Sequence, residues 1–118
     1  MIYEIGTDIE SISRIKQSIT RSKSFPAKVL TKNELEMFNA CKTKKRKIEF
    51  LAGHWSAKEA FAKAYGTGFG SQLSMQDLEV SYEENGRPIF SKTPFEGRAK
   101  LSISHTRLYV TAVVILEK

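Results

Sequence analysis

The sequence contains a single cysteine, Cys41, among 118 residues. One cysteine excludes an intrachain disulfide and a metal site built from several cysteines. No apolar run reaches the roughly 18 residues that a membrane-spanning helix needs, so we expect no membrane partner. The first residues, Met-Ile-Tyr-Glu-Ile-Gly, lack the basic and apolar regions of a signal peptide. We therefore expect a cytoplasmic location.

The rest of the composition is that of an ordinary globular protein. Hydrophobic residues make up 41% of the chain and charged residues 27%, which is typical of soluble domains. No internal repeat, low-complexity tract or linker divides the chain, so we expect residues 1–118 to form one domain. Nineteen Lys and Arg against thirteen Asp and Glu give a net charge of +6. Such a charge attracts anions, whether nucleic acid, a phosphorylated cofactor or an acidic protein.

Local patterns predict one strand and then several helices in the first half of the chain. Ile2 to Asp8 is typical of a short strand, and Ser11 is expected to cap the helix that follows it. The buried face of this helix is predicted to carry Ile12, Ile15 and Ile19. Three further signals follow: a connector or helical turn at 24–30 around Pro26, a capping box from Thr31 to Glu34, and a long helix over 45–65 that Gly66 ends.

The second half is expected to be mostly strands. Residues 78–82 and 87–90 alternate on either side of Asn85-Gly86, which predicts a hairpin. A short helical turn is expected at 94–100. Strands are then expected at 101–104 and 109–116, with a hairpin loop at 105–108 and the last strand in a central position. Helices before antiparallel strands predict an α+β fold, with N-terminal helices packed on a mainly antiparallel sheet.

The predicted long helix is apolar on two sides, and Glu59 interrupts one of them. At about 100° per residue, Glu59 falls in the middle of an apolar face, four residues after Trp55. A helix of this kind is buried between layers or packs against another subunit, so we expect Glu59 to face an interior or an interface. The face with Glu59 comprises Ile48, Leu51, Ala52, Trp55 and Ala62, and the opposite face comprises Phe50, Ala57, Phe61 and Ala64.

A carboxylate in such a position must be neutral, paired with a cation or bound to metal, because an isolated buried charge costs several kcal/mol. Two interpretations stay open. Glu59 either forms a structural pair with a lysine or arginine, or shares a metal ion with a second carboxylate, for which Asp8 is the candidate. Two carboxylates together with waters and phosphate oxygens commonly bind Mg²⁺. Asp8 could instead be a helix cap near Glu10 and Ser11.

Two lysines flank Glu59 on the predicted helix. Lys63 is the closer in projection, and a lysine beside a metal-bound phosphate could neutralise charge that develops in a transition state. For Lys58 we favour a surface lysine whose stem packs on the helix while its ammonium reaches water.

Two stretches resemble motifs of a known family. Gly6-Thr-Asp8-Ile-Glu10 is similar to a G-x-D motif, and residues 50–64, FLAGHWSAKEAFAKA, are similar to a W/F-x-x-K-E-A-x-x-K-A motif. The chain thereby resembles the short bacterial holo-acyl-carrier-protein synthases, which are phosphopantetheinyl transferases. The similarity continues in order through 30–35, 66–68, 85–86 and 104–106 to the last strand, and so covers nearly the whole chain.

The resemblance implies an activity, a cofactor and partners. The enzyme would transfer 4′-phosphopantetheine from coenzyme A to a serine of an apo acyl carrier protein, in support of fatty acid biosynthesis. Asp8 and Glu59 would bind Mg²⁺ and, with Lys63, form the catalytic set. Glu59 or a metal-bound water would accept the serine proton, and Lys63 would stabilise or protonate the leaving phosphate. A homotrimer with active sites between subunits is also implied, as in the short members of the family.

The resemblance also gives roles to the remaining basic and glycine-rich stretches. Each has a simpler explanation. The basic stretch at 44–47 could be a solvated turn, the glycines at 66–68 a helix stop, and residues 105–106 a hairpin loop. The coenzyme A candidates are Lys44, Arg46, Lys47, Lys63, Gly66, Gly68, His105 and Thr106. Arg14, Arg21 and Lys28 would bind the carrier protein, because acyl carrier proteins resemble one another in being strongly acidic.

One residue departs from the family pattern. Many relatives have arginine where this chain has His54, which is shorter and mostly neutral at pH 7. We therefore assign no phosphate or subunit contact to it.

Two other classes of protein compete with the enzyme. A nucleic-acid-binding module would use the basic residues of 42–47 with exposed aromatic rings. However, the aromatics occupy predicted core positions, and the sequence has no helix-turn-helix, RRM or zinc signature. We therefore expect no nucleic-acid partner. A purely structural oligomer would place Glu59 in a buried salt bridge.

Overall fold

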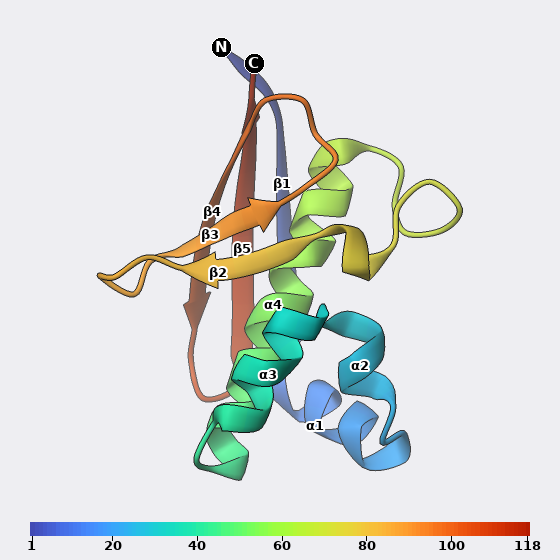
Figure 1. The fold of residues 1–118 in the computed structure, drawn as a ribbon, viewed down its shortest axis with the longest axis vertical. Helices are drawn as coiled ribbons and strands as arrows, with labels where there is room; N and C mark the ends of the chain where they lie inside the picture. Colours follow the sequence, from blue (N-terminus) through green and yellow to red (C-terminus); the bar gives the residue numbers. More distant parts are fainter.

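The computed structural model describes residues 1–118 and shows an α+β fold, as predicted (Figure 1). Three strands form an antiparallel sheet in the order β1-β5-β4, and two more form a separate hairpin. None of the helices is long and apolar enough to cross a bilayer. The elements follow in this order: β1 (Ile2–Ser11), α1 (Ile12–Arg21), α2 (Phe25–Val29), α3 (Lys32–Ala40), α4 (Lys44–Tyr65), η1 (Met75–Asp77), β2 (Glu79–Tyr82), β3 (Pro88–Lys92), β4 (Arg98–His105) and β5 (Tyr109–Glu117).

The three-stranded sheet has one covered and one open face. β5 is its central strand, as predicted, and the side chains of Val110, Ala112, Val114 and Leu116 point to the covered face and are buried. Strand register places Asp8 opposite Ala112, and Ala112 opposite Ile103 on β4. Because alternate residues share a face, Asp8 points to the covered side of the sheet, where α4 lies.

Helix α4 is the central element of the fold. In Figure 1 it runs along the sheet, with the β2–β3 hairpin crossing it and α1 to α3 gathered around its first turns. Both predicted apolar faces are therefore used within one chain, and thirteen residues of α4 are buried. The two-sided pattern came from burial between layers, so it no longer indicates a second subunit.

Two glycines set the position and length of α4. A Cβ on Gly6 of β1 would overlap the carbonyl oxygen of Ala60 and lie 2.7 Å from the amide nitrogen of Ala64. Only glycine therefore lets β1 pass this close to the helix. At the other end Gly66 adopts φ 93° and ends the helix in the left-handed conformation, as predicted.

The N-terminal helices follow their sequence signals. Ser11 caps α1, and Ile12, Ile15 and Ile19 pack in the second of two hydrophobic clusters, against α3 and α4. Thr31 and Glu34 form the predicted capping box at the start of α3. The connector around Pro26 is a short helix, α2.

One predicted element is wrong. Residues 94–100 do not form a helical turn, because β4 already begins at Arg98 and pairs with the far end of β5. The alternation of Ala99, Leu101 and Ile103 continues the covered face of the sheet. That alternation begins two residues before the strand expected at 101–104, and it was the signal that could have corrected the prediction.

Candidate functional site

Asp8 lies in the interior of β1, beside α4. Its side chain is 11% exposed, and both carboxylate oxygens have partners on the helix. The Ser56 hydroxyl donates to Oδ2 over 2.9 Å, and the Lys63 ammonium lies 3.4 Å from Oδ1. Asp8 neither ends the strand nor caps a helix, since β1 continues to Ser11, which is the cap of α1. The helix therefore holds this carboxylate in a fixed orientation.

Glu59 lies half-buried on α4, close enough to Asp8 for their charges to interact. Burial raises the pKa of Glu59, and the negative charge of Asp8 raises it further, while Lys63 opposes this effect. No ion pair includes the Glu59 carboxylate. Within one chain, Glu59 is therefore not half of a structural salt bridge.

The Asp8 and Glu59 carboxylates fit a hard divalent cation. Two neighbouring carboxylates repel each other, and a cation such as Mg²⁺ between them would remove that repulsion. The structure has no group of three or more Asp, Glu, His or Cys residues that could hold a metal ion. The other ligands of a metal here would therefore be water and substrate oxygens, which Mg²⁺ commonly retains.

The coenzyme A candidates occupy three separate places in one chain. Lys44, Arg46 and Lys47 lie in the first turn of α4, roughly 20 Å along the helix axis from Glu59. Gly66 and Gly68 follow the last turn, past Lys63. His105 and Thr106 lie where β4 ends, two strands away from Glu10 in the same row of the sheet. Only Lys63 is brought directly to the carboxylate pair.

The candidate carrier-binding residues lie on the first two helices. Arg14 is in the first turn of α1, directly after β1, and its side chain is 78% exposed, 4.0 Å from Glu10. Arg21 ends α1, and Lys28 lies in the last turn of α2, both exposed. Of the three, Arg14 borders the end of β1 that carries Asp8 and Glu10.

Lys58 is not the surface lysine that was expected. Its side chain is fully buried, and its ammonium donates to three acceptors on three different segments. These are Oε1 of Glu34 at 2.6 Å and the carbonyl oxygens of Val29 and Met75 at 2.7 and 3.0 Å. Three acceptors match the three N–H groups of an ammonium. Lys58 therefore joins α4 to α2, α3 and η1 and does not contact the Asp8 or Glu59 carboxylate.

Glu34 is the centre of a buried polar network that the sequence did not reveal. Besides Lys58, it accepts hydrogen bonds from the amides of Thr31 and Val80 and contacts Nδ1 of His54 at 2.8 Å. Burial alone would raise the pKa of Glu34, but His54 and Lys58 outweigh it and lower the pKa to about 2. The capping box predicted the Thr31 contact, but nothing in the sequence indicated the partners from α4 and β2.

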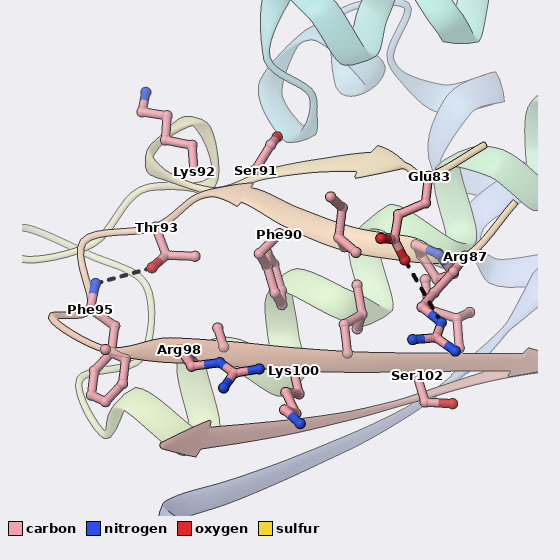
Figure 2. A pocket seen from close by; sticks show the side chains of 16 residues that line it. Glu83, Arg87, Phe90, Ser91, Lys92, Thr93, Phe95, Arg98, Lys100 and Ser102 are labelled. Atoms are coloured by element: carbon pink, nitrogen blue, oxygen red, sulfur yellow. Dashed lines mark hydrogen bonds and ion pairs between the residues drawn. The ribbon is translucent and has the colours of Figure 1, made fainter. Parts of the chain in front are cut away.

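A groove of roughly 870 Å³ lies between β3 and β4 (Figure 2). Phe90, Leu101 and Ile103 are among its apolar lining, and Figure 2 shows Phe90 pointing into the space between the strands. Four cations but only one acid line it. They are Arg87, Lys92, Arg98 and Lys100, with Glu83 paired to Arg87 at 3.8 Å. The groove therefore suits an anionic ligand with an apolar part. The four basic residues between 87 and 100 are visible in the sequence and could have indicated this groove.

Comparison with known proteins supports the same family as the motifs. A holo-[acyl-carrier-protein] synthase of Lactococcus lactis subsp. cremoris (strain SK11) is 54% identical over 118 residues, which cover 100% of this chain and 99% of the relative. The one from Streptococcus mutans is 50% identical over 100% of this chain and 98% of the relative.

Solved structures agree with this similarity. The Bacillus anthracis synthase in complex with CoA (3′,5′-ADP) has a TM-score of 0.90 and 40% identity, covering 98% of this chain and 96% of that one. The Neisseria meningitidis synthase has a TM-score of 0.91 and 35% identity over 100% of both chains. The model of one family matches residues 4–114. The chain therefore belongs to the 4′-phosphopantetheinyl transferase superfamily.

Proposed function

We propose that the chain transfers 4′-phosphopantetheine from coenzyme A to a serine hydroxyl of an apo acyl carrier protein, releasing adenosine 3′,5′-bisphosphate. The observation that carries this proposal is the carboxylate pair of Asp8 and Glu59, with the Lys63 ammonium beside it. Relatives at 50–54% identity named as holo-[acyl-carrier-protein] synthases support the choice of substrates.

The proposed chemistry uses each residue of this site in one role. Glu59 accepts the proton as the serine oxygen forms a bond to the phosphorus and the bond within the pyrophosphate breaks, and its raised pKa suits a general base. Lys63 neutralises the charge on the leaving phosphate. Ser56 keeps Asp8 oriented. When bound by Asp8 and Glu59, Mg²⁺ supplies positive charge to the pyrophosphate.

We further propose that the active sites form between copies of the chain. The open face of the sheet carries an apolar surface. At its centre Ile5 lies opposite Ile115, and Thr7 lies opposite Val113. Ile5 is 56% exposed, Ile9 65% and Tyr109 51%. Such a surface is typical of a protein interface. A second copy that covers it could bring its own basic groups to Asp8 and Glu59, which would unite the coenzyme A candidates that one chain keeps apart. The homotrimer is the form that the family resemblance predicts.

The groove between β3 and β4 is our candidate for the nucleotide part of coenzyme A. It combines apolar side chains for a base with cations for phosphates. Complexes of the Bacillus anthracis and Helicobacter pylori synthases with CoA support a ligand of this type. Lys44, Arg46, Lys47, Gly66, Gly68, His105 and Thr106 remain candidates for the remaining contacts.

Three further roles stay predictions from the sequence. Arg14, Arg21 and Lys28 would form the docking surface for an acidic carrier protein, which the net charge of +6 would attract. A role in fatty acid biosynthesis and a cytoplasmic location complete the proposal.

A mass measurement tests the proposed activity directly. The chain is mixed with coenzyme A, Mg²⁺ and an apo acyl carrier protein, and the carrier is weighed. A gain of about 340 Da, the mass of the transferred group, that disappears on chelation of the metal supports the enzyme. An unchanged carrier, together with salt-sensitive binding of DNA or RNA, would support the nucleic-acid-binding alternative instead.

A further inference from the structure

The tip of the β2–β3 hairpin is joined to α4 by one side-chain hydrogen bond. The hydroxyl of Tyr82, the last residue of β2, lies 2.9 Å from Nε2 of His54. The bonds that follow in the turn are internal, from the Glu83 amide to the Arg87 carbonyl and from the Gly86 amide to the Glu83 carbonyl. Beside the packing of the Tyr82 ring near Phe50, with 6.4 Å between the centroids, this bond is the polar contact that fixes the tip relative to the helix.

His54 is itself held rigidly. It is fully buried, its Nδ1 lies 2.8 Å from Oε2 of Glu34, and its ring stacks on Phe50 with a centroid distance of 4.0 Å. Glu34 is fixed in turn by Lys58 and by the amide of Val80. The imidazole consequently presents Nε2 to the hairpin in one orientation.

The protonation states follow from the neighbouring groups. Burial raises the pKa of Tyr82 to about 12, so its phenol keeps the proton and donates it to Nε2. Nδ1 then carries the imidazole proton and donates it to Glu34. Burial lowers the pKa of His54, as do Lys58 and Arg46 of α4, although Glu34 of α3 opposes them. Tyr82 of β2 completes the set of titratable groups around the ring. The neutral imidazole is therefore the form that accepts the Tyr82 hydrogen bond.

This contact controls one end of the groove between β3 and β4. Glu83, Arg87 and Pro88 line the groove and belong to the hairpin tip or to the strand that leaves it. We propose that His54 is a positioning residue: through Tyr82 it fixes the hairpin tip, and with it Arg87, for binding of an anionic nucleotide. The identity of the nucleotide as part of coenzyme A rests on the proposed function, whereas the clamp itself does not.

Hydrogen exchange tests the clamp without any substrate. Tyr82→Phe removes only the hydroxyl and keeps the ring near Phe50, so the fold should be preserved. We expect exchange at the amides of Glu83 and Gly86 to become about fivefold faster, because a tip without its bond to α4 opens its two internal bonds more often. Tyr65→Phe is the matched control, since no hydrogen bond involves the Tyr65 hydroxyl, and should leave these amides unchanged. Equal exchange in Tyr82→Phe and the unmodified chain would overturn the proposal.

His54→Asn provides a second variant, because its shorter amide can still donate to Glu34 but cannot reach Tyr82. Exchange at the tip should rise as in Tyr82→Phe, and the double variant should show no further increase, since both changes remove the same contact. Additive increases would contradict a shared clamp.

Kinetics then tests what the clamp does. In both variants the KM for coenzyme A should rise several-fold while kcat changes little, because the contact affects binding and not the reacting atoms. A fall in kcat with unchanged KM would contradict the positioning role. If the unmodified chain transfers no phosphopantetheine, the proposed function fails, and the exchange measurements still decide whether His54 holds the hairpin.

Discussion

The ammonium of Lys63 lies 3.4 Å from Oδ1 of Asp8, on β1, and forms no ion pair with Glu59, its neighbour one turn earlier on α4. Asp8 is thus satisfied by two helical partners, while Glu59 lies beside a like charge with no cation of its own. In the absence of metal this arrangement opposes ionisation of Glu59. A carboxylate kept in an unfavourable state beside a second carboxylate is typical of a functional site.

Glu59→Gln should therefore greatly reduce turnover and stabilise the metal-free protein. Loss of a general base lowers kcat by about 10²–10⁴-fold. Because the folded pKa of Glu59 is raised, its ionisation weakens the fold as pH rises above its ordinary value of 4.5. The variant should have a higher free energy of unfolding than the parent at pH 7, and the difference should vanish near pH 4. Urea denaturation at both pH values, alongside the carrier mass assay, measures the two effects.

The control for this prediction is Glu36→Gln, an exposed carboxylate on α3 that should change neither quantity. Added Mg²⁺ should reduce the stability advantage of Glu59→Gln, because it binds only the parent. Full activity of Glu59→Gln at saturating Mg²⁺ would refute the role of this residue.

The buried network around Glu34 should contribute more to the free energy of unfolding than the exposed ion pair of Lys63 does. Lys58→Met leaves the Glu34 carboxylate buried without its cation, which typically costs about 3–5 kcal/mol. Lys63→Met removes an ion pair whose lysine is 60% exposed, and should cost less than about 1 kcal/mol. Chemical denaturation of the two variants at pH 7 gives both values. Similar losses for the two lysines would mean that the Lys58 network contributes little.

The sequence predicted local features more reliably than their tertiary partners. Hydrophobic periodicity, capping residues and turn residues predicted the position of α4, the caps at Ser11 and Thr31, and the turn at 85–86. Lys58 and Lys63 stand five residues apart in one helix, and no local pattern says which of them is buried. The difference arises because Glu34 of α3 and two backbone carbonyls from other segments meet Lys58.

The candidate site was predicted only in part for the same reason. The motifs gave Asp8, Glu59 and Lys63, and the structure brings these three together. Ser56 belongs to the same motif, but its bond to Asp8 depends on how closely β1 passes the helix. The groove lies between β3 and β4, which are consecutive in the chain but belong to two different sheets, so it depends on how those sheets pack and not on a local pattern.

Acid should destabilise the protein in two stages once the opposite contribution of Glu59 is removed by Glu59→Gln. The folded pKa of His54 lies below its ordinary value of 6.5, so the unfolded chain takes up the proton first and stability falls as pH drops below about 6.5. Glu34 has a folded pKa of about 2 against an ordinary 4.5, so its contribution is present above pH 4.5 and is lost between there and pH 2. Denaturation curves across this range should show both stages. Adding His54→Asn should remove the first stage and keep the second, and a single stage in Glu59→Gln alone would contradict the prediction.

The open sheet face should hold copies of the chain together. Ile9→Glu places a charge at a position that is 65% exposed in one chain, so the fold itself should tolerate it. Burial of that charge in an interface would be costly, and we expect the oligomer to dissociate to monomers and activity to fall. Light scattering with size-exclusion chromatography measures the mass. Ile89→Glu makes the same change on the hairpin, where Ile89 is 37% exposed, and should leave the mass unchanged. An intact oligomer in Ile9→Glu would place the interface elsewhere.

Carrier-protein docking should depend on Arg14 more than on other exposed cations. Its side chain is 78% exposed beside the end of β1 and lies 4.0 Å from Glu10, two residues after Asp8. Arg14→Glu reverses its charge, so the KM for the carrier should rise about tenfold while kcat changes little. Lys32→Glu makes the same kind of reversal on α3, at an exposed lysine outside the proposed docking surface, and should raise KM far less. Salt provides a further test of an electrostatic role. Added NaCl should raise the KM of the parent for the carrier steeply and the KM of Arg14→Glu less. The reason is that salt screens an attraction that the variant has already partly lost. An unchanged KM in Arg14→Glu at low salt would show that the carrier binds another surface.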